Sequence, residues 1–367
     1  MKVAIVGGGI VGSFIAYYLS REGVDVTIYE KSSLGSGSVH AAGLIEPYRF
    51  DKINTTGMIK KMLSYVGKKV TIVKQLNPEW IKSLLSILNK EPPQDAWDII
   101  RSMATFSLKE YKRMAEEVND FDYEENGLLE IYQDRLDLEH GVEEEKRNPF
   151  NPKFEVIDVK GFSGAIYFPE LSKLNTYKFM ERMKRELKGV KIEIREIVNL
   201  DEISKDYDTV VLSAGVWLSK LGMPITSFKG YGYRVSGEML VKYPSVISEL
   251  GVAVVKNSDH IKITGGFDAD FSADIERAKM FLDAGNCLAK IDKVYDLSMG
   301  YRPCSPDGFP IIGRIGKFVI STGACRLGWS FGPSMGKFTA DLVLDRVKSY
   351  GYLSRLLNGR NLSVPKL

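Results

Sequence analysis

The first residues of the chain alternate between apolar runs and polar breaks in a recognisable order. Residues 3–6 form a short, continuous apolar run, as expected for a strand that is buried on both faces. Residues 10–21 carry apolar side chains at helical spacing, and residues 24–29 form a second apolar run. This order predicts a strand, a turn, a helix and a second strand at the start of the chain.

The predicted turn contains three glycines, Gly7, Gly9 and Gly12, with the spacing G-x-G-x-x-G. In such a turn the first glycine permits the tight bend, the second lets a pyrophosphate approach the backbone, and the third lets the helix pack closely. Glu30 ends the second strand, where a carboxylate can accept hydrogen bonds from ribose hydroxyls. An ordinary glycine-rich turn would leave Glu30 unexplained, so the pattern favours an adenine dinucleotide.

Residues 55–117 have helical spacing that a pair of prolines interrupts. One helix in this region carries an apolar stripe made of Trp80, Leu84, Leu85 and Leu88. A stripe of this kind can meet a membrane or a partner, but it more often faces the core of its own protein. We therefore expect the stripe to be buried.

Apolar patterning continues to the end of the chain. Residues 208–212 form another continuous run before a glycine, which predicts a further parallel strand of the opening unit. The remaining predicted elements are helices at 175–188, 274–291 and 334–350, strands at 164–168, 191–197 and 318–322, several strands within 229–266, and a turn-rich segment at 300–313.

These elements predict an α/β protein in which two domains are interleaved. A Rossmann-like FAD-binding domain would comprise residues 1–75, 150–225 and 295–360. An α+β substrate domain, built on an antiparallel or mixed sheet, would comprise residues 76–149 and 226–294. Nicotinamide dehydrogenases usually build their dinucleotide domain from one continuous segment, so an interrupted domain favours a flavin.

Composition excludes several classes of protein. The 367 residues are 44% hydrophobic and 26% charged, as in a soluble globular protein, and the net charge is only +3. Such a balance argues against nucleic acid or an anionic membrane as the main partner. No apolar run reaches the ~18 residues of a membrane-spanning helix, and the N-terminus lacks the features of a secretory signal. We expect a cytoplasmic protein, with peripheral contact at the inner face of the membrane or with a partner subunit left open.

The chain has three cysteines, Cys287, Cys304 and Cys325. Their number is odd and no C-x-x-C spacing occurs, so the sequence predicts neither a disulfide framework nor a zinc site. This pattern fits a reducing compartment.

The motifs together make the chain resemble the FAD-dependent D-amino acid oxidase superfamily, which includes glycine oxidase, sarcosine oxidase and the D-amino acid dehydrogenases. The resemblance covers nearly the whole chain. It rests on residues 2–31, 35–44 (GSGSVHAAGL), 208–217 (DTVVLSAGVW), and 301–313 (YRPCSPDGFPIIG) together with 323–330. Residues 77–85 (NPEWIKSLL) look most like the D-amino acid dehydrogenase branch. The resemblance implies FAD, a substrate domain with a β-sheet, and oxidation of a C–N bond next to a carboxylate.

Oxidation of this kind requires a group that holds the substrate carboxylate while hydride leaves Cα for N5 of the flavin. A guanidinium is suited to this task because it binds a carboxylate through two parallel hydrogen bonds. Arg302 matches the arginine that binds the carboxylate in glycine oxidase-like relatives, and Arg326 matches a second arginine. Arg49 is a weaker candidate, and Tyr301 and Tyr231 are candidates for the pocket wall.

The resemblance also implies a set of contacts with FAD. The expected residues are Gly7, Gly9, Ile10, Val11, Gly12, Glu30, Lys31, Ser36, Gly37, Ser38, His40, Ala42, Gly43, Leu44, Val198, Ala214, Gly215, Trp217, Gly323, Arg326, Leu327, Gly328, Trp329 and Ser330. His40 begins a His-Ala-Ala-Gly-Leu segment that links FAD covalently in some relatives. The aromatic residue that usually precedes this histidine is absent here, so we expect non-covalent FAD and treat a link through His40 as the alternative.

The leading hypothesis is therefore a dehydrogenase or oxidase of a D- or secondary amino acid. A 2-hydroxy acid dehydrogenase would need a similar carboxylate anchor, and an FAD-bearing subunit without its own catalysis would have the same fold. Oxygen, a quinone and a partner flavoprotein all remain open as the electron acceptor.

Overall fold

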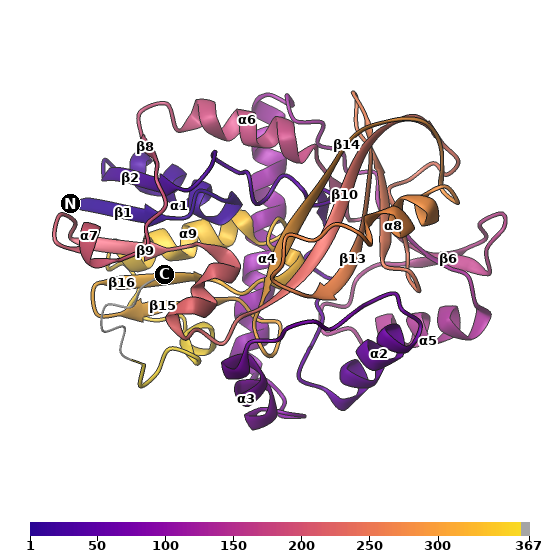
Figure 1. The fold of residues 1–367 in the computed structure, drawn as a ribbon, viewed down its shortest axis with the longest axis horizontal. Coiled ribbons are helices and arrows are strands. Elements are labelled where there is room, and N and C mark those ends of the chain that lie inside the picture. Colours follow the sequence, from indigo (N-terminus) through magenta and orange to yellow (C-terminus); the bar gives the residue numbers. More distant parts are fainter. Residues whose placement is uncertain (361–367) are drawn as a thin grey trace.

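Two β-sheets, each assembled from distant parts of the chain, form the framework of the protein (Figure 1). The computed structural model describes residues 1–360. Within that range, no helix combines the length and the apolar composition needed to cross a membrane.

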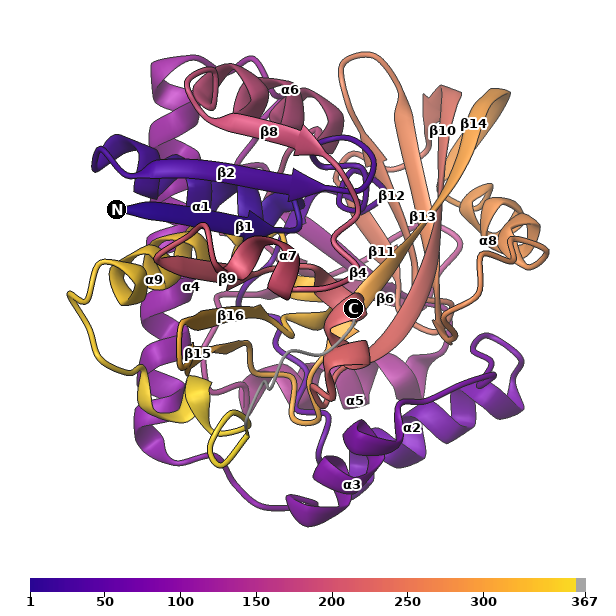
Figure 2. The same cartoon turned by 60° about the vertical axis from the view of Figure 1, so that its left-hand side comes forward.

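The first sheet has six strands in the order β15-β16-β9-β1-β2-β8, and Figure 2 shows them stacked in this order. Five of the strands are parallel, and β15 is antiparallel to β16. Their bounds are Lys2–Val6 (β1), Asp25–Glu30 (β2), Lys191–Ile194 (β8), Thr209–Leu212 (β9), Ile311–Ile315 (β15) and Phe318–Thr322 (β16). The predicted opening unit and its distant third strand are thereby confirmed.

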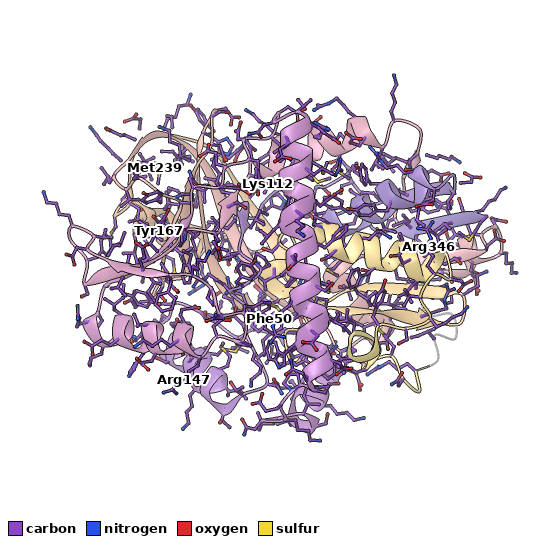
Figure 3. All side chains as sticks on the ribbon, turned by 180° about the vertical axis from the view of Figure 1, so that it is seen from behind. Phe50, Lys112, Arg147, Tyr167, Met239 and Arg346 are labelled. Carbon is purple, nitrogen blue, oxygen red and sulfur yellow. A yellow bond between two sulfur atoms is a disulfide. The ribbon has the colours of Figure 1, made fainter. Side chains whose placement is uncertain are left out.

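Helices cover one face of this sheet with a large apolar core. They are α1 (Ile10–Arg21), α4 (Gln94–Glu117), α6 (Thr176–Glu186) and α9 (Gly332–Val343), and α4 runs along the back of the molecule (Figure 3). A Cβ atom built on Gly336 would lie 2.4 Å from Cβ of Phe14, so glycine lets α9 pack directly on α1. Phe14 also lies 5.9 Å from the ring of Tyr111 on α4, which joins three helices in one core.

The second sheet has eight strands in the order β14-β10-β13-β12-β11-β4-β6-β5. All neighbouring pairs are antiparallel except β11 and β4. The bounds are Leu128–Tyr132 (β4), Glu155–Ile157 (β5), Gly164–Phe168 (β6), Thr226–Met239 (β10), Ser245–Ile247 (β11), Val252–Lys256 (β12), Ile261–Ala269 (β13) and Ala289–Cys304 (β14). Helix α8 (Ala278–Gly285) packs on one face through Phe281, and on the other face Gly232 and Gly300 lie against His40.

Shorter elements complete the fold. They are β3 (Leu44–Ile45), β7 (Ser172–Lys173), α2 (Thr56–Gly67), α3 (Pro78–Ser86), α5 (Arg135–Lys146), α7 (Asp201–Ser204), and the 3₁₀ turns η1 (Gly215–Leu221), η2 (Cys325–Leu327) and η3 (Gly351–Ser354). On α3, Trp80 and Leu84 are buried as expected, whereas Leu85 is 65% exposed.

Three predicted elements were wrong in part. The helix at 274–291 reduces to α8, because its second half pairs with β10 as the start of β14. The turn-rich segment at 300–313 begins as strand, since β14 continues to Cys304 and makes one of the longest pairings in the sheet. The last helix ends at Val343, where Asp345 adopts a positive φ angle.

The expectation that the cysteines form no disulfide was also wrong, because Cys304 and Cys325 are joined. Pairing of Cys304 with Ala324 in an isolated β-bridge brings the two cysteines together, although 21 positions separate them in sequence. Such a distant pair leaves no recognisable spacing, and Cys287 remains as an exposed free cysteine. The number of cysteines therefore gives no support for a reducing compartment.

The domain boundaries remain a prediction. Strands β5 and β6 fall within residues 150–225, which the sequence assigns to the dinucleotide domain, yet both pair in the eight-stranded sheet.

Candidate functional site

The glycine-rich turn lies at the carboxyl end of β1, where the first helix begins. Gly7 has a φ angle of +105°, and a Cβ atom there would lie 2.6 Å from the carbonyl oxygen of Ser213. A Cβ atom on Gly12 would lie 2.0 Å from the carbonyl oxygen of Gly7. Glycine is thus required at both positions, and α1 begins directly after the turn, as in sites where a helix N-terminus binds a phosphate.

Glu30 lies beside this turn at the end of β2. Its carboxylate accepts hydrogen bonds from the backbone N–H groups of Gly8, at 2.8 Å, and Ser32, at 3.1 Å. The next residue, Lys31, lies over the ring of Trp217 with its Nζ atom 4.3 Å from the centroid. These contacts place the acid next to the turn, as a dinucleotide site requires, and place Trp217 beside Lys31.

The loop from Ser36 to Gly43 connects the turn to the eight-stranded sheet. The hydroxyl of Ser38 accepts a hydrogen bond from the N–H of Ile10 at 3.0 Å, and the carbonyl oxygen of Ser38 accepts one from the indole of Trp329 at 2.9 Å. A Cβ atom on Gly43, whose φ angle is +85°, would lie 2.1 Å from the carbonyl oxygen of Leu174. The loop is thereby held between both sheets.

His40 lies against the glycines of the eight-stranded sheet. A Cβ atom on Gly300 of β14 would lie 3.3 Å from Cβ of His40, and one on Gly232 of β10 would lie 3.0 Å from its carbonyl oxygen. Burial, reinforced by the nearby charge of Lys262, lowers the pKa of His40 to about 4. The ring is therefore neutral at neutral pH, and its buried Nδ1 atom has no hydrogen-bond partner among the described residues.

Arg302 lies on the same face of β14, two residues after Gly300. Its Nη1 atom donates a hydrogen bond to the carbonyl oxygen of Gly266 at 2.8 Å, and its guanidinium lies 5.3 Å from the centre of the Phe267 ring. No carboxylate among residues 1–360 forms an ion pair with it. Burial and repulsion from Arg326 lower the pKa of Arg302 to about 10, which leaves the group cationic at neutral pH.

The other two candidate arginines are already paired with acids. Arg326 forms ion pairs with Glu46, at 2.6 Å, and with Asp51. Arg49 lies between Glu46 and Glu130, with its Nη2 atom 2.6 Å from the carboxylate of Glu130. Burial opposes the charge on Arg326, but the attraction of Asp51 and Glu46 outweighs it and raises the pKa. Both arginines therefore lie near the site with their charge balanced.

The candidate tyrosines point away from Arg302. Side chains of adjacent residues in a strand face opposite sides, so Tyr301 lies on the other face of β14 and its hydroxyl donates to the carbonyl oxygen of Ser272 at 3.0 Å. Tyr231 stacks on Phe281 of α8, and its hydroxyl donates to Asp268 at 3.0 Å. The structure thus does not bring either hydroxyl to the face that carries Arg302 and His40.

The remaining expected contacts lie on several elements. Ala214 and Gly215 follow β9 and Gly323 follows β16, at the same edge of the parallel sheet as the turn, and Val11 is in the first turn of α1. Ala42 lies in the loop, and Leu44 begins β3. Leu327, Gly328, Trp329 and Ser330 form the segment that leads into α9, and the hydroxyl of Ser330 accepts a hydrogen bond from the N–H of Glu46. Val198 is 49% exposed beyond β8.

Sequence reasoning missed a buried lysine beside His40. Lys262 of β13 donates hydrogen bonds to the carbonyl oxygen of Val39 and to the hydroxyl of Thr176, the latter at 3.0 Å. Burial lowers its pKa to about 7. A lysine inside a strand pattern suggests an exposed position, so the sequence gave no sign that Lys262 is buried beside His40.

An apolar cluster next to Arg302 was also missed. It contains Phe228, Trp80 and Cys304, and Phe267 packs against it with its ring stacked on Phe228 at 4.4 Å. Because these residues come from four separate elements, only the fold brings them together.

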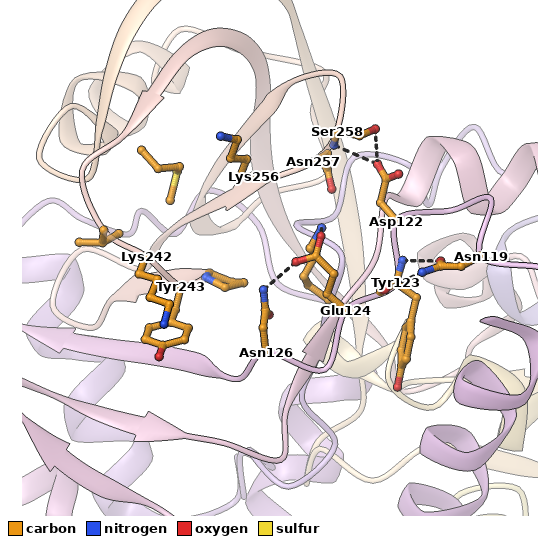
Figure 4. A pocket seen from close by; sticks show the side chains of 14 residues that line it. Asn119, Asp122, Tyr123, Glu124, Asn126, Lys242, Tyr243, Lys256, Asn257 and Ser258 are labelled. Carbon is orange, nitrogen blue, oxygen red and sulfur yellow. Dashed lines mark hydrogen bonds and ion pairs between the residues drawn. The ribbon is translucent and has the colours of Figure 1, made fainter. Parts of the chain in front are cut away.

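A surface pocket of about 570 Å³ lies elsewhere, at the far end of β10 from Arg302. Asp122, Glu124, Lys242 and Lys256 are among its lining residues, and Asp122 bonds Ser258 there (Figure 4). None of the predicted site residues lines this pocket.

Comparison with known proteins identifies the family. A family model described as "DAO: FAD dependent oxidoreductase" matches residues 2–342. The chain belongs to this family. The match confirms the resemblance, the FAD cofactor and the class of enzyme that the sequence predicts.

Relatives of this FAD-dependent oxidoreductase cover nearly its full length. A D-proline dehydrogenase of Pyrobaculum islandicum is 40% identical over 359 residues, which is 94% of this chain and 96% of the relative. A D-amino acid dehydrogenase of Helicobacter pylori is 22% identical, over 94% of this chain and 95% of the relative. The structure of glycine oxidase from Bacillus cereus superposes with a TM-score of 0.67 at 18% identity, covering 98% of this chain and 99% of that one, and confirms the fold.

The residues of the site fit FAD. The tight turn at Gly7 and the close packing at Gly12 have the geometry of a dinucleotide-binding turn, and Glu30 lies beside it. Near the other end of the site, His40 presents a buried nitrogen without a partner. These groups would hold the two ends of the cofactor, with Arg302 beyond His40 on the same sheet face.

Proposed function

We propose that the protein oxidises a small D- or secondary amino acid, with D-proline as the first substrate to test. The observation that carries this proposal is the half-buried guanidinium of Arg302, which pairs with no carboxylate among the described residues. A cation partly withdrawn from water without a carboxylate partner is costly, and an incoming substrate carboxylate would reduce that cost. The D-proline dehydrogenase relative supports the choice of substrate.

The side chains around Arg302 would orient the substrate. The hydrogen bond to Gly266 and the Phe267 ring hold the guanidinium, leaving its other N–H groups free to bind a carboxylate. Phe228 and Phe267 offer an apolar surface to the substrate side chain. When bound, FAD supplies the acceptor for the two electrons. Precise positioning of the substrate is a large part of catalysis, and the chain supplies it.

We further propose that FAD binds non-covalently. The neutral ring of His40 is packed against the glycines of β10 and β14, where it can donate or accept one hydrogen bond through Nδ1. Denaturation in acid should release all of the flavin into the supernatant. Flavin that stays with the precipitated protein would support the covalent alternative through His40.

The enzyme would pass its electrons to an acceptor other than oxygen, because the D-proline and D-amino acid oxidising relatives are named as dehydrogenases. A quinone and a partner flavoprotein both fit this role. Substrate oxidation should proceed with an artificial dye and should produce little hydrogen peroxide in air.

Arg302→Ala tests the proposed function. Loss of a charge-assisted, two-point contact should lower kcat/KM for D-proline by about 100-fold, mainly through KM, while the flavin content stays unchanged. Arg346→Ala is the control, since this arginine is exposed and pairs with Glu22 beyond the C-terminal end of α1, the end remote from the glycine-rich turn. An unchanged KM for Arg302→Ala would remove this residue from the site. Failure of D- and secondary amino acids to reduce the flavin anaerobically, with reduction by a 2-hydroxy acid instead, would overturn the reaction itself.

A further inference from the structure

The segment from α2 to Lys90 carries a charge that the rest of the chain does not share. Residues 56–90 contain seven lysines, no arginine and one acid, Glu79, which is a balance of +6. The whole chain carries only +3, so the remaining 332 residues carry −3. The small net charge of the whole chain is therefore compatible with one strongly basic region.

Five of the seven lysines form no ion pair with a described residue. Lys60, Lys68, Lys69, Lys82 and Lys90 are exposed, and no described carboxylate lies within ion-pair distance of them. By contrast, Lys61 and Lys74 of the same segment are paired with acids. The five unpaired lysines leave the surface of α2 and α3 with a net positive potential.

Exposed apolar side chains accompany these lysines. On α3, Trp80 and Leu84 face the core, while Ile81 and Leu85 lie on a neighbouring face of the helix with exposed fractions of 38% and 65%. Ile81 and Leu85 are four residues apart and therefore neighbours on one helix face. On α2, Leu63 is 63% exposed. Figures 1 and 2 both show α2 and α3 together at the lower edge of the molecule.

We propose that α2 and α3 form a docking surface for an anionic lipid membrane. Outward leucine and isoleucine side chains with flanking lysines are typical of helices that lie in the interface of a membrane, because the apolar groups enter the acyl region and the lysines reach the headgroups. Protein interfaces are instead enriched in arginine and aromatic residues and depleted in lysine. This surface has no arginine, and its aromatic residues Tyr65 and Trp80 are half-buried and buried.

Docking in this way would bring the membrane close to the substrate end of the site. Ile59 and Met62, on the inner side of α2, pack against the apolar cluster that contains Phe228. Phe228 stacks on Phe267, and Phe267 lies under Arg302. A lipid-soluble acceptor such as a quinone would therefore lie on the same side of the enzyme as its substrate. The docking surface itself does not depend on which substrate is oxidised.

Sedimentation of the FAD-loaded enzyme with lipid vesicles tests the proposal. The protein should bind vesicles with about 30% phosphatidylglycerol in phosphatidylcholine, bind at least tenfold more weakly to pure phosphatidylcholine, and dissociate as salt rises. Charge reversal in the triple variant Lys60→Glu, Lys68→Glu, Lys82→Glu should reduce binding to the anionic vesicles by at least tenfold.

A matched pair of variants tests the apolar contribution. Leu85→Ser should weaken vesicle binding several-fold, whereas Leu136→Ser on α5 should leave it unchanged, although Leu136 is equally exposed at 64%. Dye-linked activity in solution should be unchanged in all variants, which shows that they are folded. Wild-type protein that fails to bind anionic vesicles would overturn the proposal, and so would equal losses in Leu85→Ser and Leu136→Ser. An acidic protein partner would be the alternative if salt-sensitive binding occurred only to such a protein and never to lipid.

Discussion

Among the buried arginines near the site, Arg302 differs in what balances its charge. Arg49 and Arg326 are surrounded by Glu46, Asp51 and Glu130, and they hold the loop after β3 in place. Arg302 has only a carbonyl oxygen and an aromatic ring. The sequence could indicate all three as candidates, but it could not rank them by their partners, because the acids that neutralise two of them lie in distant segments.

Phe267 provides a prediction at this scale. Its ring lies between the Arg302 guanidinium and Phe228, so Phe267→Leu should loosen the guanidinium and reduce the apolar surface for the substrate. We expect kcat/KM for D-proline to fall about tenfold, through a loss of roughly 1–1.5 kcal/mol, with the flavin still bound. Steady-state kinetics would measure the effect, and Phe338→Leu, in a stacked pair with Tyr350 on the outer side of α9, is the control. Equal kcat/KM values for Phe267→Leu and the wild type would show that the ring does not contribute.

At the scale of elements, the local sequence pattern predicts the helices and strands that are almost entirely buried. The opening helix was predicted with its observed bounds, Ile10–Arg21, and β1, β2 and β9 were found because all of their residues are buried except some at the strand ends. The errors lie where long-range pairing outweighs local preference. In β14, Ile291, Leu297 and Met299 pack against the core of the second sheet, but charged residues and two register shifts interrupt the apolar pattern, so the strand depends on its pairing with β10.

Asp122 lies in the loop after α4 and binds Ser258 between β12 and β13, which links this loop to the second sheet. Burial would raise the pKa of Asp122, but hydrogen bonds from Lys178, Ser258 and Asn175 lower it to about 2. The folded protein therefore gains stability from this carboxylate above the unfolded pKa, near 3.8, and loses it as pH falls through about 2.

Asp122→Asn should accordingly lower the free energy of unfolding at pH 7 by about 1 kcal/mol, a modest value because the group is partly solvated. The difference from the wild type should shrink below pH 4 and vanish near pH 2. Urea titrations at several pH values would measure it, with Asp292→Asn, at an exposed position without an ion pair among the described residues, as the control. A difference that stays constant with pH would contradict the role given to this carboxylate.

At the scale of the whole molecule, function depends on segments that are remote in sequence but meet at one place. The glycine-rich turn follows β1, and Glu30 ends β2. The loop of residues 36–43 reaches the second sheet at His40, and Arg302 lies in β14, more than 250 residues further along the chain. The motifs made this convergence predictable for the cofactor. The apolar cluster, Lys262 and the disulfide were not predictable, since each depends on contacts that the two sheets create only when packed together.

The disulfide connects these two sheets directly beside the site. Cys304 ends β14 of the eight-stranded sheet, two residues after Arg302, and Cys325 follows β16 of the six-stranded sheet, one residue before Arg326. Closing a loop of 21 positions reduces the freedom of the unfolded chain by about 3 kcal/mol in the entropic account of disulfides. The double variant Cys304→Ala, Cys325→Ser should therefore unfold at a lower temperature than the wild type, whereas Cys287→Ser, at the exposed free cysteine, should not.

Thiol counting separates this effect from simple loss of packing at the buried Cys304 position. Without reductant, the denatured wild type should react with one equivalent of a thiol reagent, from Cys287, and after reduction with three. The reduced wild type should then share most of the stability loss of the double variant, because both lack the cross-link while only the variant lacks the buried sulfur. Three reactive thiols before reduction would show that the cross-link does not form in solution, and the two sheets would then be held beside Arg302 by packing alone.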